Sequence, residues 1–366
     1  MTASVANHLR AVAEIRPERL YHSRMDILTH AVMGAALASG VVSLRYRGQK
    51  SALALRRSAA IAGAAAGVLP DADALIQSGA DALLVLDYHR HFTHALAFVP
   101  IGALVATALL WPLLRRRLGF WRLYLCCFVA YLAHPLLDAC TSYGTHLWLP
   151  VLQRREAWNL IAVVDPVFTL LLALPQIFFL RDPKSKAVAW GLALGMAYFG
   201  FSFMQQQRGE AAALALVQAR GHQATQLSVK PSMANLLLWR SLYVHDGRVQ
   251  VDAFHLGPTL RHYPGESAPL LDMAAAQAVA AGDMRRVDDI ERFRAFSDGF
   301  LVLDRQRPGF VGDARYAMQP TVVAPIWGLQ WRGPGAATEF VSRHEFSPAM
   351  RRDFLAMLLG RDKPAP

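Results

Sequence analysis

Histidine and aspartate pairs recur at the ends of apolar segments in the first half of the chain. His134 and Asp138 are spaced i,i+4, so on a helix the imidazole and the carboxylate share one face, one turn apart. Asp26 and His30 repeat this spacing. Either pair can bind one metal ion. A single pair is as often a capping or packing contact, but two pairs beside other ionisable groups favour a metal site.

The sequence HRHFTH supplies three imidazoles just before an apolar stretch. His91 and His94 share a face if a helix begins there, whereas His89 comes from the preceding loop. Imidazole binds zinc, iron, copper and nickel, and added carboxylates favour a hydrolytic zinc or manganese site over an electron-transfer site. The alternative is a solvated helix-capping loop with ordinary histidines. We expect a divalent metal, with zinc the first candidate.

The sequence LPDAD places two carboxylates after a proline. A turn there can aim Asp71 at a metal ion and Asp73 at a second metal or at a ligand histidine. The alternative is a solvated helix end. An aspartate that is not a ligand can act as a general base, and Asp73 is the candidate for that role.

Other polar residues beside these motifs have two interpretations each. Arg90 can clamp a phosphate or stabilise an anionic transition state, or it can extend to the membrane interface. The Tyr143 hydroxyl can orient a substrate or a ligand carboxylate. Asp165, before Pro166, can cap a helix or bind metal. The predicted metal ligands are Asp26, His30, Asp71, His89, His91, His94, His134 and Asp138, and the predicted catalytic residues are Asp73, Arg90 and Tyr143.

The composition indicates that part of the chain lies in a membrane. Of 366 residues, 54% are hydrophobic and 18% are charged, below the roughly 25% charged residues of an average soluble domain. A span takes about 20 apolar residues. Six segments reach or approach that length: Ile27–Leu44, Ser58–Ile76, Thr93–Leu114, Trp121–Ala139, Ile161–Leu180 and Ala187–Met204.

Basic residues gather in alternate connections between these segments. The runs 45–57, 115–122 and 181–186 are rich in Arg and Lys, which places them in the cytoplasm. The intervening connections then lie on the outer, periplasmic side, and every His/Asp motif falls at the outer end of its segment. The tail before Met25 carries four arginines. Met25 as the true start, or a re-entrant first segment, would resolve this conflict.

The chain changes character after Gln205, where short β-like runs alternate with helical ones. We therefore expect a mainly α fold: a transmembrane bundle of about six spans in 25–204, a smaller periplasmic α+β domain in 205–366, and a tail, 1–24, that is untranslated if Met25 is the true start. The net charge of +11 is scattered over short loops, so no nucleic-acid partner is predicted. The three cysteines lack CxxC spacing, which indicates helix packing.

The chain resembles the YdjM-like family of membrane-bound, predicted metal-dependent hydrolases. The matching elements are MDILTHAVMGAAL, LPDADALI, HRHFTHAL, HPLLDACTSYGTHLWLP and NLIAVVDPVFTL, in this order. The His/Asp arrangement is also similar to that of zinc-dependent phospholipase C, whose clustered metals include a helical H-x-x-x-D element matched by His134 and Asp138. No helical H-x-x-x-E pair is evident later in the chain, so the resemblance implies one or two metals rather than three.

Three functions are compatible with these patterns. The first is a metal-dependent hydrolase of the bacterial inner membrane that acts at its outer surface on phosphodiesters or phospholipid headgroups, with the lipid bilayer as its main partner. The second is a metal ion transporter, in which the cluster is a transit site. The third is a scaffold with a structural metal. A transporter would carry polar residues on towards the cytoplasmic ends of its helices, and these segments do not.

Overall fold

The computed structural model describes residues 27–43, 52–182, 186–333, 335–343 and 345–362. These residues form two compact units, each treated separately below. The first contains the described residues up to Gly79 together with Tyr88–Trp158 and Val163–Gly200. The second contains Ala80–Asp87, Asn159–Ala162 and the chain from Phe201 onward. The domain boundary at 204/205 remains a prediction.

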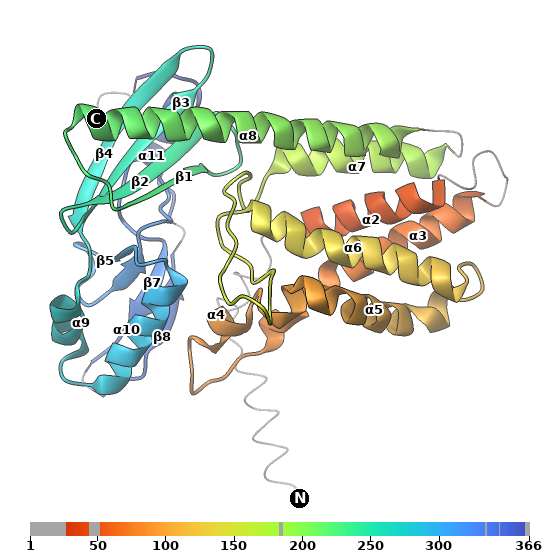
Figure 1. The fold of residues 1–366 in the computed structure, drawn as a ribbon, viewed down its shortest axis with the longest axis horizontal. Helices are drawn as coiled ribbons and strands as arrows, with labels where there is room; N and C mark the ends of the chain where they lie inside the picture. Colours follow the sequence, from red (N-terminus) through yellow and green to blue (C-terminus); the bar gives the residue numbers. More distant parts are fainter. Residues whose placement is uncertain (1–26, 44–51, 183–185, 334, 344, 363–366) are drawn as a thin grey trace, which may run out of the picture. The chain divides into compact units, whose positions relative to one another are not determined.

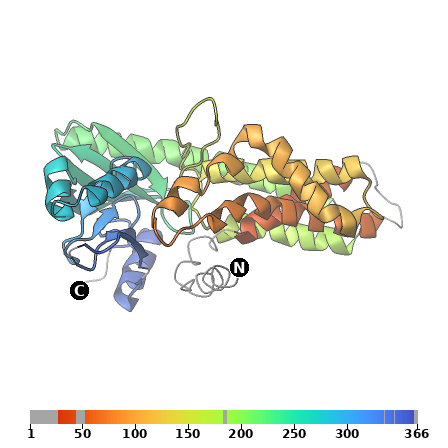
Figure 2. The ribbon, with the colours of Figure 1, turned by 90° about the horizontal axis from the view of Figure 1, so that it is seen from below.

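The first unit is a bundle of helices that run side by side (Figures 1 and 2). Its α-helices are α2 (Ile27–Ser43), α3 (Ala52–Val68), α5 (Val99–Leu114), α6 (Phe120–Cys140), α7 (Pro166–Arg181) and the first part of α8 (Ala187–Ala219). Short 3-10 helices, η3 (Leu69–Leu75), η4 (Phe92–His94) and η5 (Leu96–Phe98), join α3 to α5. Each of the six apolar segments therefore contains a helix.

Three of the described helices are long and apolar enough to cross a membrane: Leu96–Leu114, Phe120–Cys140 and Ala187–Ala219. The six predicted spans are thus only partly supported. At about 1.5 Å per residue, the 17 residues of α2 and the 16 of α7 rise only about 25 Å, less than the roughly 30 Å of a hydrocarbon core.

Two helix boundaries differ from the predicted ones. The third segment was expected to begin at Thr93, but two 3-10 turns delay the start of α5 to Val99. The sixth segment was expected to end near Met204. Instead α8 continues to Ala219. The polar run after Met204 contains good helix formers such as Gln and Arg, so the loss of apolar character does not end the helix.

Small residues allow the helices of the bundle to approach closely. A Cβ atom added to Gly34 would lie 2.2 Å from the Gly63 carbonyl oxygen, and one added to Gly63 would lie 2.1 Å from the Gly34 carbonyl oxygen. Such small-residue contacts are typical of helix association in lipid. The core around them is rich in alanine and includes Cys126 and Cys127, which confirms the packing role predicted for these two cysteines.

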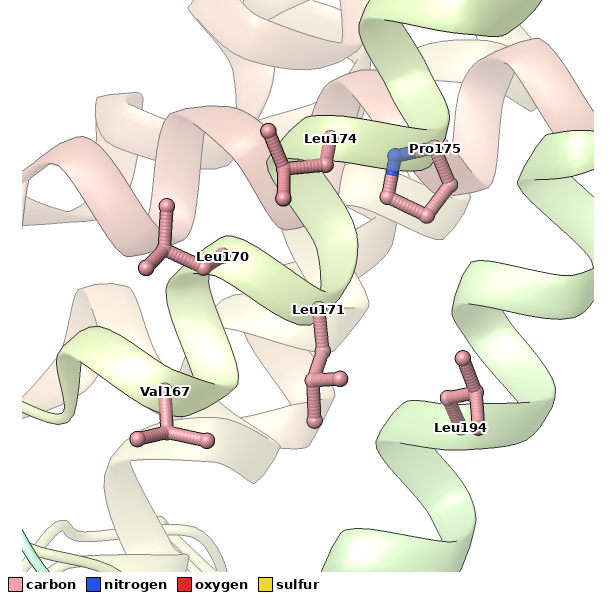
Figure 3. Close-up of a pocket in the computed structure, with 6 residues that line it drawn as sticks. All are labelled: Val167, Leu170, Leu171, Leu174, Pro175 and Leu194. Atoms are coloured by element: carbon pink, nitrogen blue, oxygen red, sulfur yellow. The ribbon is translucent and has the colours of Figure 1, made fainter.

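An apolar groove of about 300 Å³ lies between α7 and the first part of α8 (Figure 3). Its lining consists only of Val167, Leu170, Leu171, Leu174, Pro175 and Leu194, and includes none of the predicted site residues. The groove is therefore part of the apolar surface of the bundle and is separate from the residues predicted to bind metal.

The second unit combines two antiparallel four-stranded sheets with helices. The first sheet has the order β1 (Gln226–Pro231), β2 (Leu238–His245), β3 (Arg248–Leu256) and β4 (Leu260–Pro269). The helices α9 (Met273–Ala280) and α10 (Met284–Phe296) follow. The second sheet has the order β5 (Leu301–Leu303), β6 (Val311–Asp313), β7 (Trp327–Gln330) and β8 (Glu339–Ser342), and α11 (Pro348–Leu358) comes last. The α+β interpretation is borne out by these two sheets.

A buried arginine joins the first sheet to the loop after β6. The Arg240 guanidinium donates to four backbone carbonyls, those of Ala314, Gln319, Pro320 and Val322, at 2.8 to 3.1 Å. Apolar residues of both sheets complete this core, among them Leu242, Val251 and Val302. The short helix α4 (Leu84–Tyr88) also belongs to this unit, except for its last residue.

Candidate metal centre

Three elements of the first unit carry the site residues. The 3-10 helix η3 starts at Leu69 and Pro70, where a proline is favoured, and it presents Asp71 and Asp73 directly after α3. The last two turns of α6 carry His134 and Asp138 on one face, as their spacing predicts. The turns between Tyr88 and His94 hold the remaining donors.

Four donor atoms from these elements converge on one point. They are Asp71 Oδ1, His94 Nε2, His134 Nε2 and Asp138 Oδ2. His94 Nε2 lies 3.0 Å from His134 Nε2 and 3.1 Å from Asp138 Oδ2. His134 Nε2 lies 3.3 Å from Asp138 Oδ2 and 3.4 Å from Asp71 Oδ1, and His94 Nε2 lies 3.7 Å from Asp71 Oδ1. These four residues can hold one metal ion.

The opposite ring nitrogens show which atoms face the centre. His134 Nδ1 lies 2.6 Å from the Gly67 carbonyl oxygen, which can only accept, so this nitrogen carries the proton. His94 Nδ1 lies 3.1 Å from Asp73 Oδ2, an arrangement common behind metal-binding histidines. In these neutral tautomers both Nε2 atoms carry lone pairs. Two lone pairs and two carboxylates then meet within 4.8 Å of one another, and they repel one another unless a cation or added protons lie between them.

The spacing of the four donors fits zinc. Zinc–nitrogen and zinc–oxygen distances of about 2.0–2.2 Å in a tetrahedral site give donor–donor separations of about 3.3–3.6 Å. The five separations given above, 3.0 to 3.7 Å, bracket this range. Two imidazoles and two carboxylates are also ligand types that zinc accepts. The residues present therefore fit the metal that the sequence predicts.

A second group of three residues adjoins the first and shares Asp71 with it. Its other members are Asp73 and His89, whose Nδ1 lies 2.8 Å from Asp73 Oδ1. Asp73 Oδ2 accepts hydrogen bonds from the Arg90 backbone amide at 3.0 Å and from Thr93 Oγ1 at 2.6 Å. The Asp73 carboxylate thus contacts four residues of the HRHFTH turn: His89, Arg90, Thr93 and His94.

Asp138 has a second set of contacts on its other oxygen. Its Oδ1 lies 3.0 Å from Arg90 Nη2 and 3.2 Å from His30 Nε2. Arg90 Nη1 donates to Thr141 Oγ1 at 3.0 Å, and the guanidinium lies 4.9 Å from the Tyr143 ring centroid. Arg90 has a φ of +62°, an unusual backbone conformation for a non-glycine residue. The Arg90 guanidinium thus lies against the Asp138 carboxylate, the Thr141 hydroxyl and the Tyr143 ring.

The structure brings most of the sequence-predicted site residues together. His30, Asp71, Asp73, His89, Arg90, His94, His134 and Asp138 form one connected cluster. Tyr143 borders it, with its ring 5.8 Å from that of His89. Asp26 lies outside the described residues. Asp165 caps α7 by accepting from the Phe168 amide at 3.0 Å, which confirms its capping role.

His91 lies away from the four convergent donors. His91 is the N-cap residue of the 3-10 helix η4 and has a non-helical backbone conformation (φ −94°, ψ −119°), so it does not extend the helical face of His94. Its ring contacts that of His146 at 5.0 Å instead. Burial, together with Arg155 and His91 nearby, lowers the pKa of His146 to about 4, so this imidazole is neutral at pH 7.

Sequence reasoning missed the groups that hold the donors in place. The hydroxyl of Thr93 and the carbonyl of Gly67 each fix a site residue. Thr93 directly precedes His94, and its side chain could have been suspected from that position. A backbone carbonyl such as that of Gly67 leaves no signal in the sequence.

Comparisons with known proteins agree with the membrane interpretation. The YdjM inner membrane protein family matches residues 25–209, just over half of the chain. The "Uncharacterized protein YfhP" of Bacillus subtilis (strain 168) is 31% identical over 157 residues, which are 42% of this chain and 46% of that protein. The chain thus spans about half the length of this curated relative. No solved structure matches the chain. The extent of the family match, over the segment that contains every donor of the site, shows that the chain belongs to the YdjM inner membrane protein family.

Proposed function

We propose that this protein is an integral membrane metal-dependent hydrolase whose metal ion is bound by Asp71, His94, His134 and Asp138. One observation carries the proposal: two histidine Nε2 atoms and two carboxylate oxygens converge in buried surroundings. Burying such groups is costly unless a cation joins them. Zinc suits this donor set best.

A divalent ion held by these residues supplies hydrolytic chemistry, because it lowers the pKa of water and polarises a phosphoryl or carbonyl oxygen. The protein residues around it have separate tasks. Asp73 fixes the ring of His94, and Arg90 fixes the carboxylate of Asp138. We therefore assign positioning roles to Asp73 and Arg90. These contacts occupy the Asp73 carboxylate that a general base would use and the Arg90 guanidinium that a phosphate clamp would use.

The approach to the centre lies beside Asp71 and His89. The side chains of His94, His134 and Asp138 are fully buried, whereas those of Asp71 and His89 remain 14% and 15% exposed. A substrate therefore reaches the centre on the side of Asp71. The second donor group, which shares Asp71, would hold a second ion there. Substrates of the phosphodiester class, including phospholipid headgroups, suit one or two divalent ions at a membrane surface.

We expect purified protein loaded with zinc to hydrolyse either a chromogenic phosphodiester or the phospholipids of vesicles. A chelator should remove the activity, and added zinc should restore it. The control is protein with His134 changed to alanine, purified in the same detergent. Zinc bound by the wild type without turnover of either substrate class would contradict the hydrolase and favour a transporter or a scaffold.

We also propose that the site and the C-terminal domain face the periplasm. The Arg-rich runs 45–57 and 115–122 support this orientation. A periplasm-active reporter fused after Gln205 should be active, and the same reporter fused in the run 115–122 should be silent. The opposite pattern would place the site in the cytoplasm.

A further inference from the structure

A loop of the first unit, residues 147–158, carries exposed apolar side chains beside the metal centre. It belongs to the connection that follows α6, at the end of the bundle where the four donors lie (Figure 1). Val151 is 85% exposed and Leu152 is 49% exposed, and Trp148 and Trp158 are exposed as well. We call this segment the tryptophan loop. Apolar side chains grouped on a surface mark a site of contact with another protein or with a membrane.

One carboxylate holds both indoles of the tryptophan loop. Glu156 is buried, and its two oxygens accept from Trp148 Nε1 at 2.9 Å and from Trp158 Nε1 at 3.4 Å. The oxygen that Trp148 contacts also accepts from Arg154 Nε. Backbone hydrogen bonds in both directions join Glu156 to Thr145, at 2.8 and 3.0 Å. Because the indole N–H groups have partners inside the loop, the rings can enter an apolar layer without an unpaired donor.

The composition of the loop favours lipid over a protein partner. Tryptophan rings are enriched at the level of the lipid headgroups, and arginine side chains pair with lipid phosphates. Arg154 follows the apolar tip directly and is largely exposed. Helix α6, which leads into the loop, is long and apolar enough to cross a membrane. A helix that crosses the membrane ends at its surface, which brings the loop to the lipid headgroups.

The tryptophan loop is joined to residues that border the metal centre. The His146 amide, just before the loop, donates to the Arg90 carbonyl at 3.0 Å, and the Arg90 guanidinium contacts Asp138. From within the loop, the Arg155 guanidinium lies 5.3 Å from the Tyr143 ring centroid. Arg90 approaches the same ring to 4.9 Å. Lipid headgroups around the loop would therefore adjoin the metal centre.

We propose that the tryptophan loop lies in the interfacial layer of the bilayer and presents membrane phospholipids to the metal centre. Val151 and Leu152 then contact the acyl chains, and Arg154 lies at the level of the phosphates. The second part of this inference rests on the proposed hydrolase and names its substrate class as phospholipid taken from the bilayer. The first part, the position of the loop, does not depend on any catalytic activity.

The position of the loop is tested with the full-length protein in vesicles of phosphatidylethanolamine and phosphatidylglycerol. A nitroxide label is attached to Val151→Cys or to Arg154→Cys after the three native cysteines are changed to alanine. At position 151 the label should collide more often with oxygen, which concentrates among acyl chains, than with a water-soluble nickel chelate. At position 154 this order should reverse. A label at 151 that favours the nickel chelate, or that is shielded from both reagents by protein, would overturn the proposal.

The presentation of lipid is tested with the double variant Val151→Asp and Leu152→Asp, loaded with zinc in the same vesicles. Hydrolysis of vesicle phospholipid should fall about tenfold, which corresponds to about 1.4 kcal/mol of lost apolar contact. Hydrolysis of a short-chain phospholipid with the same headgroup, dissolved as monomers, should not change, and neither should the zinc dissociation constant. The control Gln153→Asp adds a charge at an exposed polar position of the loop and should match the wild type in all three measurements.

These measurements separate the two parts of the inference. Full activity of the double variant on vesicle phospholipid, or equal losses on vesicle and monomeric phospholipid, would contradict the presentation of lipid by the loop. A wild type that hydrolyses neither substrate would contradict the proposed hydrolase and, with it, the second part. The collision rates of the label at position 151 would still decide whether the loop lies in the bilayer.

Discussion

His134→Ala should lose its bound zinc, with a dissociation constant that rises about 100- to 1,000-fold. A structural four-ligand zinc site contributes about 10–16 kcal/mol of binding free energy, so one donor of four accounts for roughly 2.5–4 kcal/mol. Solvent does not readily replace the lost imidazole, because the His134 ring is fully buried. The ring is also held in place through its other nitrogen by the Gly67 carbonyl. Metal content after dialysis, with competition titration, is the measurement.

The matched control is His146→Ala in the same unit. His146 is a neutral, partly buried imidazole that contacts His91 and does not belong to the convergent donors. This variant should keep its zinc. Asp138→Asn keeps the size of the Asp138 side chain but removes its charge, and should resemble His134→Ala. Zinc retained by both His134→Ala and Asp138→Asn would exclude the four-donor centre.

The site could be predicted from the sequence where ligands are close in the chain. The i,i+4 spacing of His134 and Asp138 gave a correct helical face, because α6 is regular up to Cys140. LPDAD and HRHFTH were recognised as neighbours of apolar segments, and both reach the cluster. All three histidines of HRHFTH were predicted as ligands, and His91 lies apart from the four convergent donors. Its position depends on where α5 begins, and two 3-10 turns set this boundary without a clear sequence signal.

The fold could likewise be predicted where it depends on local sequence patterns. It could not be predicted where it depends on pairing between distant segments. The hairpin of β2 and β3 follows from alternating apolar residues around Asp246 and Gly247, both of which have positive φ. Strand β4 is hard to predict from its sequence, LRHYPGESAP, because it contains a glycine and two prolines. It forms because it pairs with β3, with a bulge between Gln250 and Asp252. Long-range pairing of this kind overrides local preference.

Neither residue spacing nor local secondary-structure patterns could have identified the partners of Asp138. Its carboxylate meets Arg90, 48 residues away in the chain, and His30 on another helix. The sequence left two interpretations for Arg90, an anion-stabilising role and an extension to the membrane interface. In the structure its guanidinium contacts Asp138 and Thr141. If Asp138 binds the metal as proposed, an arginine beside its carboxylate changes the charge balance of the whole centre.

Arg90→Ala should destabilise the metal-free protein by about 3 kcal/mol or more, because removing one partner of a buried ion pair leaves the other charge uncompensated. Asp138 is fully buried and the Arg90 side chain is 7% exposed, so solvent cannot replace the lost contact. Zinc should restore most of the stability, since the ion neutralises the same carboxylate from its other oxygen. The zinc-induced rise in the thermal unfolding midpoint should therefore be larger in Arg90→Ala than in the wild type.

Two further substitutions make this result specific to the buried pair. Arg154→Ala removes an arginine whose side chain is 70% exposed beside Glu156, and should shift the free energy of unfolding by less than about 1 kcal/mol. Arg90→Lys keeps a positive charge without the planar fork and should lie between the wild type and Arg90→Ala. If metal-free Arg90→Ala unfolds at the wild-type temperature, Asp138 is not held by Arg90 in solution. If zinc stabilises both proteins equally, the ion does not share that carboxylate, and the charge balance argued for the four donors fails with it.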